Sequence, residues 1–217
     1  MKKQPVKRGE ARERLLLATR DKIIAQGVDG VSIRAINAAA GVSAGIFHYH
    51  FESLEELILE LLGRFMKPLM AERENLLDLL SDRKKPATMQ EVAEALVMPV
   101  AKLAIDHHEG YGHVCLLARL YADRSPLLQL ANKRWGSKFN SKLFKQLQLC
   151  NPGLSNDELA IRMDLAGLAM LRGLSALHQP PVVWLKQQNS AKVDEWEQVR
   201  IIVDFVAAGL GATQQPS

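Results

Sequence analysis

Hydrophobic residues recur at steps of three and four along most of this 217-residue chain, which is the spacing of one face of a helix. No run of convincing length alternates between apolar and polar positions as a half-buried strand does. Helices are predicted over residues 10–26, 54–80, 89–106, 112–121, 126–149, 156–177 and 191–210, with two short ones within 32–50. Loops are expected at 82–87, 107–111, 150–154 and 178–189. The fold class is therefore all-α.

Most predicted helix starts carry capping residues. In a capping box, a serine or threonine hydroxyl accepts from the third backbone N–H, and an acidic side chain at that position bonds back to the cap. The predicted boxes are Ser53–Glu56, Thr88–Glu91 and Ser155–Glu158; Ser32, Ser43 and Ser125 are further expected caps. Pro68 and Pro99 fall inside predicted helices and are expected to kink or break them.

Charge is distributed unevenly along the chain. Residues 1–50 carry nine Lys or Arg and four Asp or Glu, a net charge of +5, whereas the remainder carries 19 and 20. A basic segment of this size attracts a polyanion such as nucleic acid or an acidic membrane surface, although a merely solvated face has the same composition. With 47% hydrophobic residues, the rest of the chain is able to bury a sizeable core.

The cysteine content and the lack of long apolar runs indicate the cellular compartment. Cys115 and Cys150 are the only cysteines, too few for a disulfide framework and without metal-binding spacing. The N-terminus lacks the apolar run of a signal peptide, and no stretch approaches the ~20 apolar residues that span a bilayer. The sequence therefore predicts a soluble cytoplasmic protein with no membrane partner.

Residues 32–50 have the layout of two short helices joined at Gly41, which is the helix-turn-helix arrangement. The turn needs positive φ, which glycine tolerates. In this motif the second helix enters the major groove of DNA while flanking residues contact phosphates. Phe47 and Phe51 are expected to be core anchors rather than groove readers. The candidate DNA contacts are Ser32, Arg34, Ser43, Ala44, Ile46, His48, Tyr49 and His50.

Residues 32–57 read SIRAINAAAGVSAGIFHYHFESLEEL, a segment that resembles the TetR family of bacterial transcriptional regulators. The positions that match the family pattern are Ile36, Ala40, Gly41, Val42, Ser43, Gly45, His50, Phe51, Ser53, Glu55 and Leu57. Three positions depart from it. Asn37 replaces the usual alanine, His48 replaces a tyrosine, and Leu54 replaces the lysine that usually meets a DNA phosphate.

The resemblance implies a division of labour along the chain. Residues 1–53 would form the DNA-binding domain, and residues 54–217 a helical domain for effector binding and dimerisation. The expected function is a ligand-responsive regulator, a repressor, that binds a pseudo-palindromic double-stranded DNA operator as a homodimer. The alternative is a helical ligand-binding or interaction protein with lost or weakened DNA binding, an idea motivated by His48 and Leu54.

The two C-terminal helices have more apolar positions than one core contact needs. An apolar face of the helix in residues 156–177 and one of the helix in 191–210 are expected to form a four-helix dimer interface with a second copy. In the alternative, both helices simply close the core of a monomer. The candidate interface residues are Leu159, Met163, Ala166, Met170, Leu174, Trp196, Val199, Val203 and Val206.

A small-molecule effector is expected to be apolar or amphipathic, because the candidate pocket residues are mostly apolar with a few polar groups. These residues, each also compatible with an ordinary core, are Met98, Leu103, His107, Tyr111, Leu117, Tyr121, Trp135, Phe139 and Met170.

Residues 106–113, DHHEGYGH, are the one constellation that suggests catalysis or metal binding. Two glycines weaken any helix that would align Glu109 with His113, and the paired Glu-x-x-His motifs of a di-metal bundle are lacking. His48 and His50, two apart on a helix, point to different faces and are poorly placed to chelate. No enzyme activity, cofactor or metal is expected.

Overall fold

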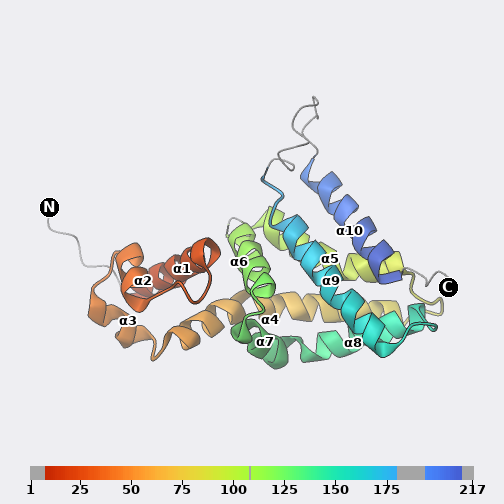
Figure 1. Ribbon diagram of the computed structural model, residues 1–217, viewed down its shortest axis with the longest axis horizontal. Helices are drawn as coiled ribbons and strands as arrows, with labels where there is room; N and C mark the ends of the chain where they lie inside the picture. Colours follow the sequence, from red (N-terminus) through yellow and green to blue (C-terminus); the bar gives the residue numbers. More distant parts are fainter. Residues whose placement is uncertain (1–7, 108, 180–193, 212–217) are drawn as a thin grey trace.

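The structure is a computed structural model that describes residues 8–107, 109–179 and 194–211, and these residues form helices and no strand (Figure 1). The all-α fold class is confirmed. The elements are α1 (Arg8–Gln26), α2 (Ile33–Ala40), α3 (Ala44–His50), α4 (Leu54–Ser81), α5 (Met89–Asp106), α6 (Gly110–Ala122), α7 (Pro126–Ala131), the π-helical turn η1 (Asn132–Gly136), α8 (Ser137–Cys150), α9 (Asn156–Leu174) and α10 (Glu195–Gly211).

The molecule has two parts, with α1–α3 forming a head at one end and α5–α10 forming a larger body at the other. The long helix α4 starts in the head and runs through the body (Figure 1). Phe47 and Phe51, the predicted anchors, are 0% and 2% exposed and belong to the same core as Leu57 at the start of α4. The head is therefore joined to α4 by shared apolar packing as well as by the chain.

The predicted starts at Leu54, Met89, Pro126 and Asn156 are confirmed, whereas α1 and α6 each begin two residues earlier than predicted. Only some of the caps act as predicted. Thr88 and Glu91 make a complete capping box at α5. Ser53 accepts from the Glu56 N–H at 3.0 Å, whereas the Glu56 carboxylate accepts from the N–H of Glu52 rather than from the cap. Ser32 and Ser155 also accept from their helices, at 3.2 Å each. The remaining two, Ser43 and Ser125, stand at the N-cap positions of α3 and α7 as expected, but neither side chain makes a cap hydrogen bond.

Other differences concern helix continuity. Neither Pro68 nor Pro99 breaks its helix, because α4 and α5 each continue across the proline. The single helix predicted over 126–149 is instead α7 and α8 with η1 between them. The helix predicted to reach residue 177 ends at Leu174, and residues 191–193 of the last predicted helix lie outside the described residues.

The body is a stack of antiparallel and crossing helices in which α10 packs along α5 and α9, and α4 lies between α5 and α8 (Figure 1). Its core is formed by small and branched residues of α5 and α6, such as Ala93, Val97, Val114 and Leu116, all fully buried. None of the helices described is both long and apolar enough to cross a membrane.

Candidate nucleic-acid interface and ligand cavity

The turn between α2 and α3 has the geometry that the motif requires. Gly41 adopts φ 67° and ψ 31°, a left-handed conformation that costs glycine nothing, and the Val42 N–H donates to the Asn37 carbonyl at 3.0 Å. The buried Asn37 side chain then donates to the Ala44 carbonyl at 3.4 Å, across the turn. At the position where the family usually has alanine, Asn37 thus makes a hydrogen bond that links α2 to the first residue of α3.

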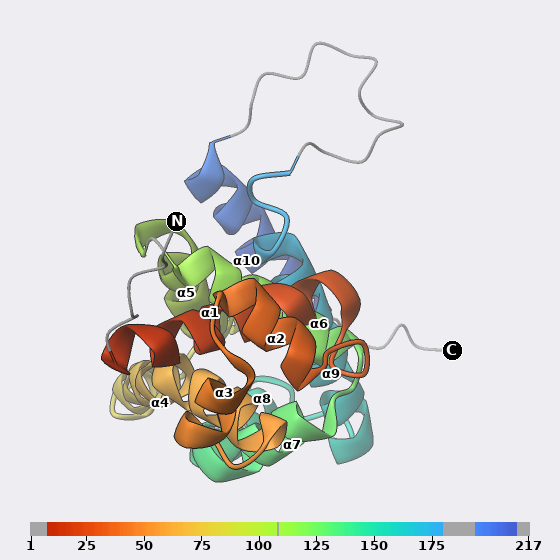
Figure 2. The ribbon, with the colours of Figure 1, turned by 90° about the vertical axis from the view of Figure 1, so that its left-hand side faces the viewer.

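The second helix of the motif, α3, lies at the outer end of the head (Figures 1 and 2). Its two aromatic residues differ in burial, because Phe47 is fully buried whereas Tyr49 is 53% exposed. Tyr49 packs edge-on against His50, with ring centroids 4.9 Å apart. Of the candidate DNA contacts, Ser32, Arg34, Ser43, Ala44, His48 and Tyr49 are exposed or partly exposed, and Ile46 and His50 are half-buried.

Leu54, which stands where the family usually has lysine, opens α4 beside this surface. It is half-buried and packs against the core of the head. The two residues that follow, Glu55 and Glu56, are exposed carboxylates in the first turn of α4. The start of α4 therefore presents an apolar side chain where the family pattern has a cation, and of the two carboxylates that follow it Glu55 belongs to that pattern.

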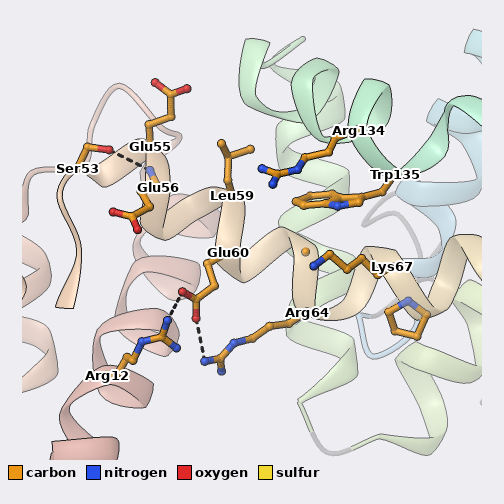
Figure 3. Close-up of a pocket in the computed structure, with 12 residues that line it drawn as sticks. Arg12, Ser53, Glu55, Glu56, Leu59, Glu60, Arg64, Lys67, Arg134 and Trp135 are labelled. Carbon is orange, nitrogen blue, oxygen red and sulfur yellow. Dashed lines mark hydrogen bonds and ion pairs between the residues drawn. The ribbon is translucent and has the colours of Figure 1, made fainter.

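A surface groove of about 730 Å³ lies where α4 leaves the head (Figure 3). On its wall, Glu60 pairs with Arg12 of α1 and accepts from Arg64 Nη2 at 3.0 Å. Arg64 also donates to Glu13 Oε2 at 2.7 Å. Partial burial lowers the Arg64 pKa, but the hydrogen bonds and charges of Glu13 and Glu60 outweigh it, so that pKa is raised. These ion pairs tie α1 to α4.

Trp135 of η1 forms the body side of this groove. Its ring lies against Gly63 of α4, where an added Cβ would stand 3.0 Å from two ring carbons. Lys67 Nζ and Arg134 Cζ each lie 5.5 Å from the Trp135 ring, on its two sides in Figure 3. Asn132, at the start of η1, lines a second hollow, a cavity inside the body that is described below. The π-helical turn therefore contacts both the cavity and the helix that leads to the head.

A cavity of about 350 Å³ lies in the body between α4, α5, α6, α8 and α9. Its lining is largely apolar, as expected of a small-molecule site, and this volume is near the lower end of the usual range of roughly 300–1,000 Å³. Four of the residues proposed from the sequence line it, namely Leu117, Tyr121, Phe139 and Met170.

The other five proposed pocket residues lie elsewhere. Trp135 lies in the groove of Figure 3. Tyr111 donates its hydroxyl to the Ser175 carbonyl at 2.7 Å, and burial raises the pKa of this phenol to about 12. Met98 and Leu103 are half-buried against the core, and His107 is exposed at the end of α5.

The cavity also contains a residue that was not proposed, Arg73 of α4. Its side chain is 5% exposed, and its guanidinium lies 5.1 Å from the Phe139 ring. A sequence signal for it exists: Arg73 falls between Met70 and Leu77 at steps of three and four, on the apolar stripe of α4. A charged residue on such a stripe indicates either a partner in the core or a function.

The described residues of the segment 106–113 are not brought together as a group of possible metal ligands. Asp106, His107 and Glu109 are exposed, and His108 lies outside the described residues. His113 stacks on Phe65 with ring centroids 4.5 Å apart, and burial followed by the charge of Arg20 lowers its pKa. Across the described ranges, no group of three or more His, Cys, Asp or Glu side chains is placed to hold a metal ion.

The apolar positions of α9 and α10 divide into a buried and an exposed stripe. Most residues proposed for the dimer interface are on the buried one: Leu159, Ala166, Met170, Leu174, Val199, Val203 and Val206 are at most 6% exposed, Met163 is half-buried and Trp196 is 39% exposed. The exposed stripes consist of Ile161, Leu165 and Leu168 on α9 and Ile201 and Phe205 on α10. Contact with a second copy stays a prediction, but only the exposed stripes are accessible to it.

The fold joins a helix-turn-helix head to a helical body with a cavity, the architecture of a class of transcriptional regulators. The pattern of the bacterial regulatory proteins of the tetR family matches residues 15–61, and the tetracyclin repressor-like C-terminal domain matches residues 94–209. The chain belongs to the TetR family. None of the curated proteins compared matches it.

Solved structures with the same fold span nearly the whole chain. A TetR family regulator from Marinobacter aquaeolei is 13% identical, covers 93% of this chain and 95% of its own, and has a TM-score of 0.56. FadR from Bacillus subtilis, in complex with stearoyl-CoA, is 15% identical over 91% and 98%, with a TM-score of 0.55. PfmR from Thermus thermophilus is 17% identical over 94% and 98%, with a TM-score of 0.54.

Proposed function

We propose that this protein is a ligand-responsive transcriptional repressor, not an enzyme, that acts in the cytoplasm and binds a pseudo-palindromic operator as a homodimer. The observation that carries the proposal is the exposed second helix of the motif, α3, mounted on the left-handed turn at Gly41. Three exposed side chains, Ser43, His48 and Tyr49, can donate hydrogen bonds to the phosphate oxygens and base-edge acceptors of DNA.

The exposed apolar stripes support pairing with a second copy. Leu165 and Phe205 are 59% and 65% exposed on helices whose opposite faces are buried in the subunit. Large apolar side chains exposed in a row along a helix favour an interaction site over a solvated face, and helices α9 and α10 pack along each other (Figure 1). With their symmetry mates they would form a four-helix interface, and a twofold dimer presents two reading heads to two half-sites.

The cavity supports a response to a small molecule. Its apolar lining and its volume suit an apolar or amphipathic effector, and the relative FadR has been solved in complex with stearoyl-CoA. An effector that binds one arrangement of the subunits better than another shifts the population toward it. Through Asn132 and Trp135 of η1, a change at the cavity has a direct route to α4 beside Gly63 and Pro68.

Fluorescence anisotropy with labelled DNA from around the protein's own gene tests the proposal. We expect one fragment to bind far more tightly than unrelated DNA, with an affinity that falls steeply as salt is added. Weak binding that ignores sequence would instead support the alternative, a helical ligand-binding protein with weakened DNA binding. Leu54, which replaces the cation of the family pattern, and His48, which replaces its tyrosine, are the observations in favour of that alternative.

A further inference from the structure

The guanidinium of Arg73 is a buried positive charge on the wall of the body's cavity. One of its terminal nitrogens, Nη2, donates to the Leu96 carbonyl and lies 3.4 Å from the sulfur of Met170. Its Nε is buried with no hydrogen-bond partner. Buried charges in proteins are ordinarily paired and fully hydrogen-bonded, because an uncompensated buried charge is strongly destabilising.

No side chain in the described part of the chain forms an ion pair with Arg73. Glu72 precedes it on α4 but is exposed. The one carboxylate that lines the cavity, Asp164, accepts from the Tyr121 hydroxyl at 3.0 Å and lies 3.8 Å from Arg124. The Phe139 ring and the Met170 sulfur offer the cation only weak, polarisable contacts. Among the described residues the guanidinium therefore has no counter-charge, and a bound anion would supply one.

We propose that the effector is a small carboxylate with an apolar body, and that Arg73 binds its carboxylate inside the cavity. This inference rests on the proposed role of the cavity as the effector site. The planar fork of an arginine matches the two oxygens of a carboxylate. Around it, Met66, Met70, Met163 and Met170 line the cavity with flexible, polarisable side chains that adapt to an apolar body.

The titration of Arg73 agrees with this assignment. Burial lowers its pKa to about 9, an effect that Glu72 only partly offsets, so burial disfavours the charge although the guanidinium stays protonated at neutral pH. A bound carboxylate would raise that pKa again, as Glu13 and Glu60 do for Arg64 on the same helix.

Isothermal titration calorimetry of the full chain tests the proposal with probes that differ in charge and little else. The probes are octanoate and 4-methylbenzoate, their neutral amides, and octylammonium as the opposite charge. We expect at least one carboxylate to bind about tenfold or more tightly than its amide, since a desolvated charge-assisted pair is lost in the amide, and octylammonium to be excluded. Equal binding of acid and amide, or no binding of either acid, would overturn the proposal.

Variants assign the charge preference to Arg73. Arg73→Met keeps the length and removes the charge, so the preference for acid over amide should fall to within about threefold, while Arg73→Lys should keep part of it. Arg83→Met, outside the cavity and paired with Glu91, is the matched control and should bind as the unaltered chain does. A preference that survives in Arg73→Met would refute the assignment.

The unliganded variant gives a second measurement. If Arg73 is present for a ligand, Arg73→Met leaves the melting temperature of the free protein unchanged or higher, because no protein carboxylate loses its partner. A fall as large as that of a core truncation would show that the guanidinium is a structural part of the core, and would overturn the proposal.

DNA binding separates this inference from the proposed function. A protein that binds its operator but takes octanamide as tightly as octanoate contradicts the carboxylate effector and leaves the repressor standing. Arg73-dependent octanoate binding in a chain that fails to recognise DNA supports the carboxylate site and contradicts the repressor.

Discussion

The head and the body place charge and apolar surface in opposite ways. In the head, Phe47 and Phe51 are inside and polar groups such as Tyr49 and His48 are outside. In the body, α9 and α10 expose large apolar side chains, and a guanidinium lies inside the cavity. The head is built as an ordinary folded unit with a polar, water-facing outer helix, whereas the body has two features that fit the proposed partners, a second copy and an effector.

The largest expected effect is on the apolar outside of the body. Burying a Phe side chain contributes about 1.5–3 kcal/mol, and a twofold interface contains Phe205 twice. Phe205→Glu should therefore weaken self-association by at least about a hundredfold, as measured by sedimentation velocity over a concentration series.

Leu149→Glu is the control for this experiment, because Leu149 is equally exposed, at 66%, but lies on α8 away from both stripes. Dissociation by Leu149→Glu as well, or an unaltered chain that sediments as a monomer at micromolar concentration, would contradict the proposed interface.

The apolar inside of the head is the next test. Phe47→Ala removes a fully buried ring, and truncations of this kind cost about 3–5 kcal/mol. Chemical denaturation of the full chain should show this loss, together with a loss of operator binding. An unchanged unfolding free energy would mean that the head does not depend on this ring.

Tyr49→Ala tests the polar outside of the head on the same helix. Because Tyr49 is half exposed, its loss should change stability by less than about 0.5 kcal/mol. If the phenol contacts DNA, the same variant should lose about 1–3 kcal/mol of operator binding in anisotropy titrations. Normal binding by this variant would remove Tyr49 from the DNA surface.

The smallest effect is expected at the start of α4. Leu54→Lys restores the cation of the family pattern and should tighten binding to all DNA sequences alike, steepening the salt slope by about one. Leu79→Lys adds the same charge to an exposed position at the far end of α4 and should change neither quantity. If the two variants behave alike, position 54 does not face phosphate.

Local signals explain why much of the fold follows from the sequence. A capping box at Thr88 and Glu91 places the start of α5 at Met89 because the cap, the helix dipole and the apolar periodicity agree. The turn at Gly41 follows from glycine's tolerance of positive φ. In the head, therefore, motif and local chemistry point to the same surface.

The body is less predictable because long-range packing decides between locally equal alternatives. Helix α9 is apolar on two lines, and only its position over the core buries Leu159 and Ala166 and leaves Ile161 and Leu165 exposed. Nothing local distinguishes the two lines. Five of the nine proposed pocket residues missed the cavity for the same reason, since an apolar residue that lines a cavity looks like one in the core.

The ion pairs of Glu60 with Arg12 and Arg64 affect how a salt titration of DNA binding is read. Each neutralised phosphate contributes a slope of about −0.9 on logarithmic axes. The dissolved salt that weakens phosphate contacts also screens these part-exposed ion pairs, over a Debye length of about 10 Å at 0.1 M. These pairs hold α1 against α4. Part of the salt dependence of DNA binding therefore arises from these ion pairs within the protein. Ionic strength thus also changes how strongly α1 of the head is attached to α4.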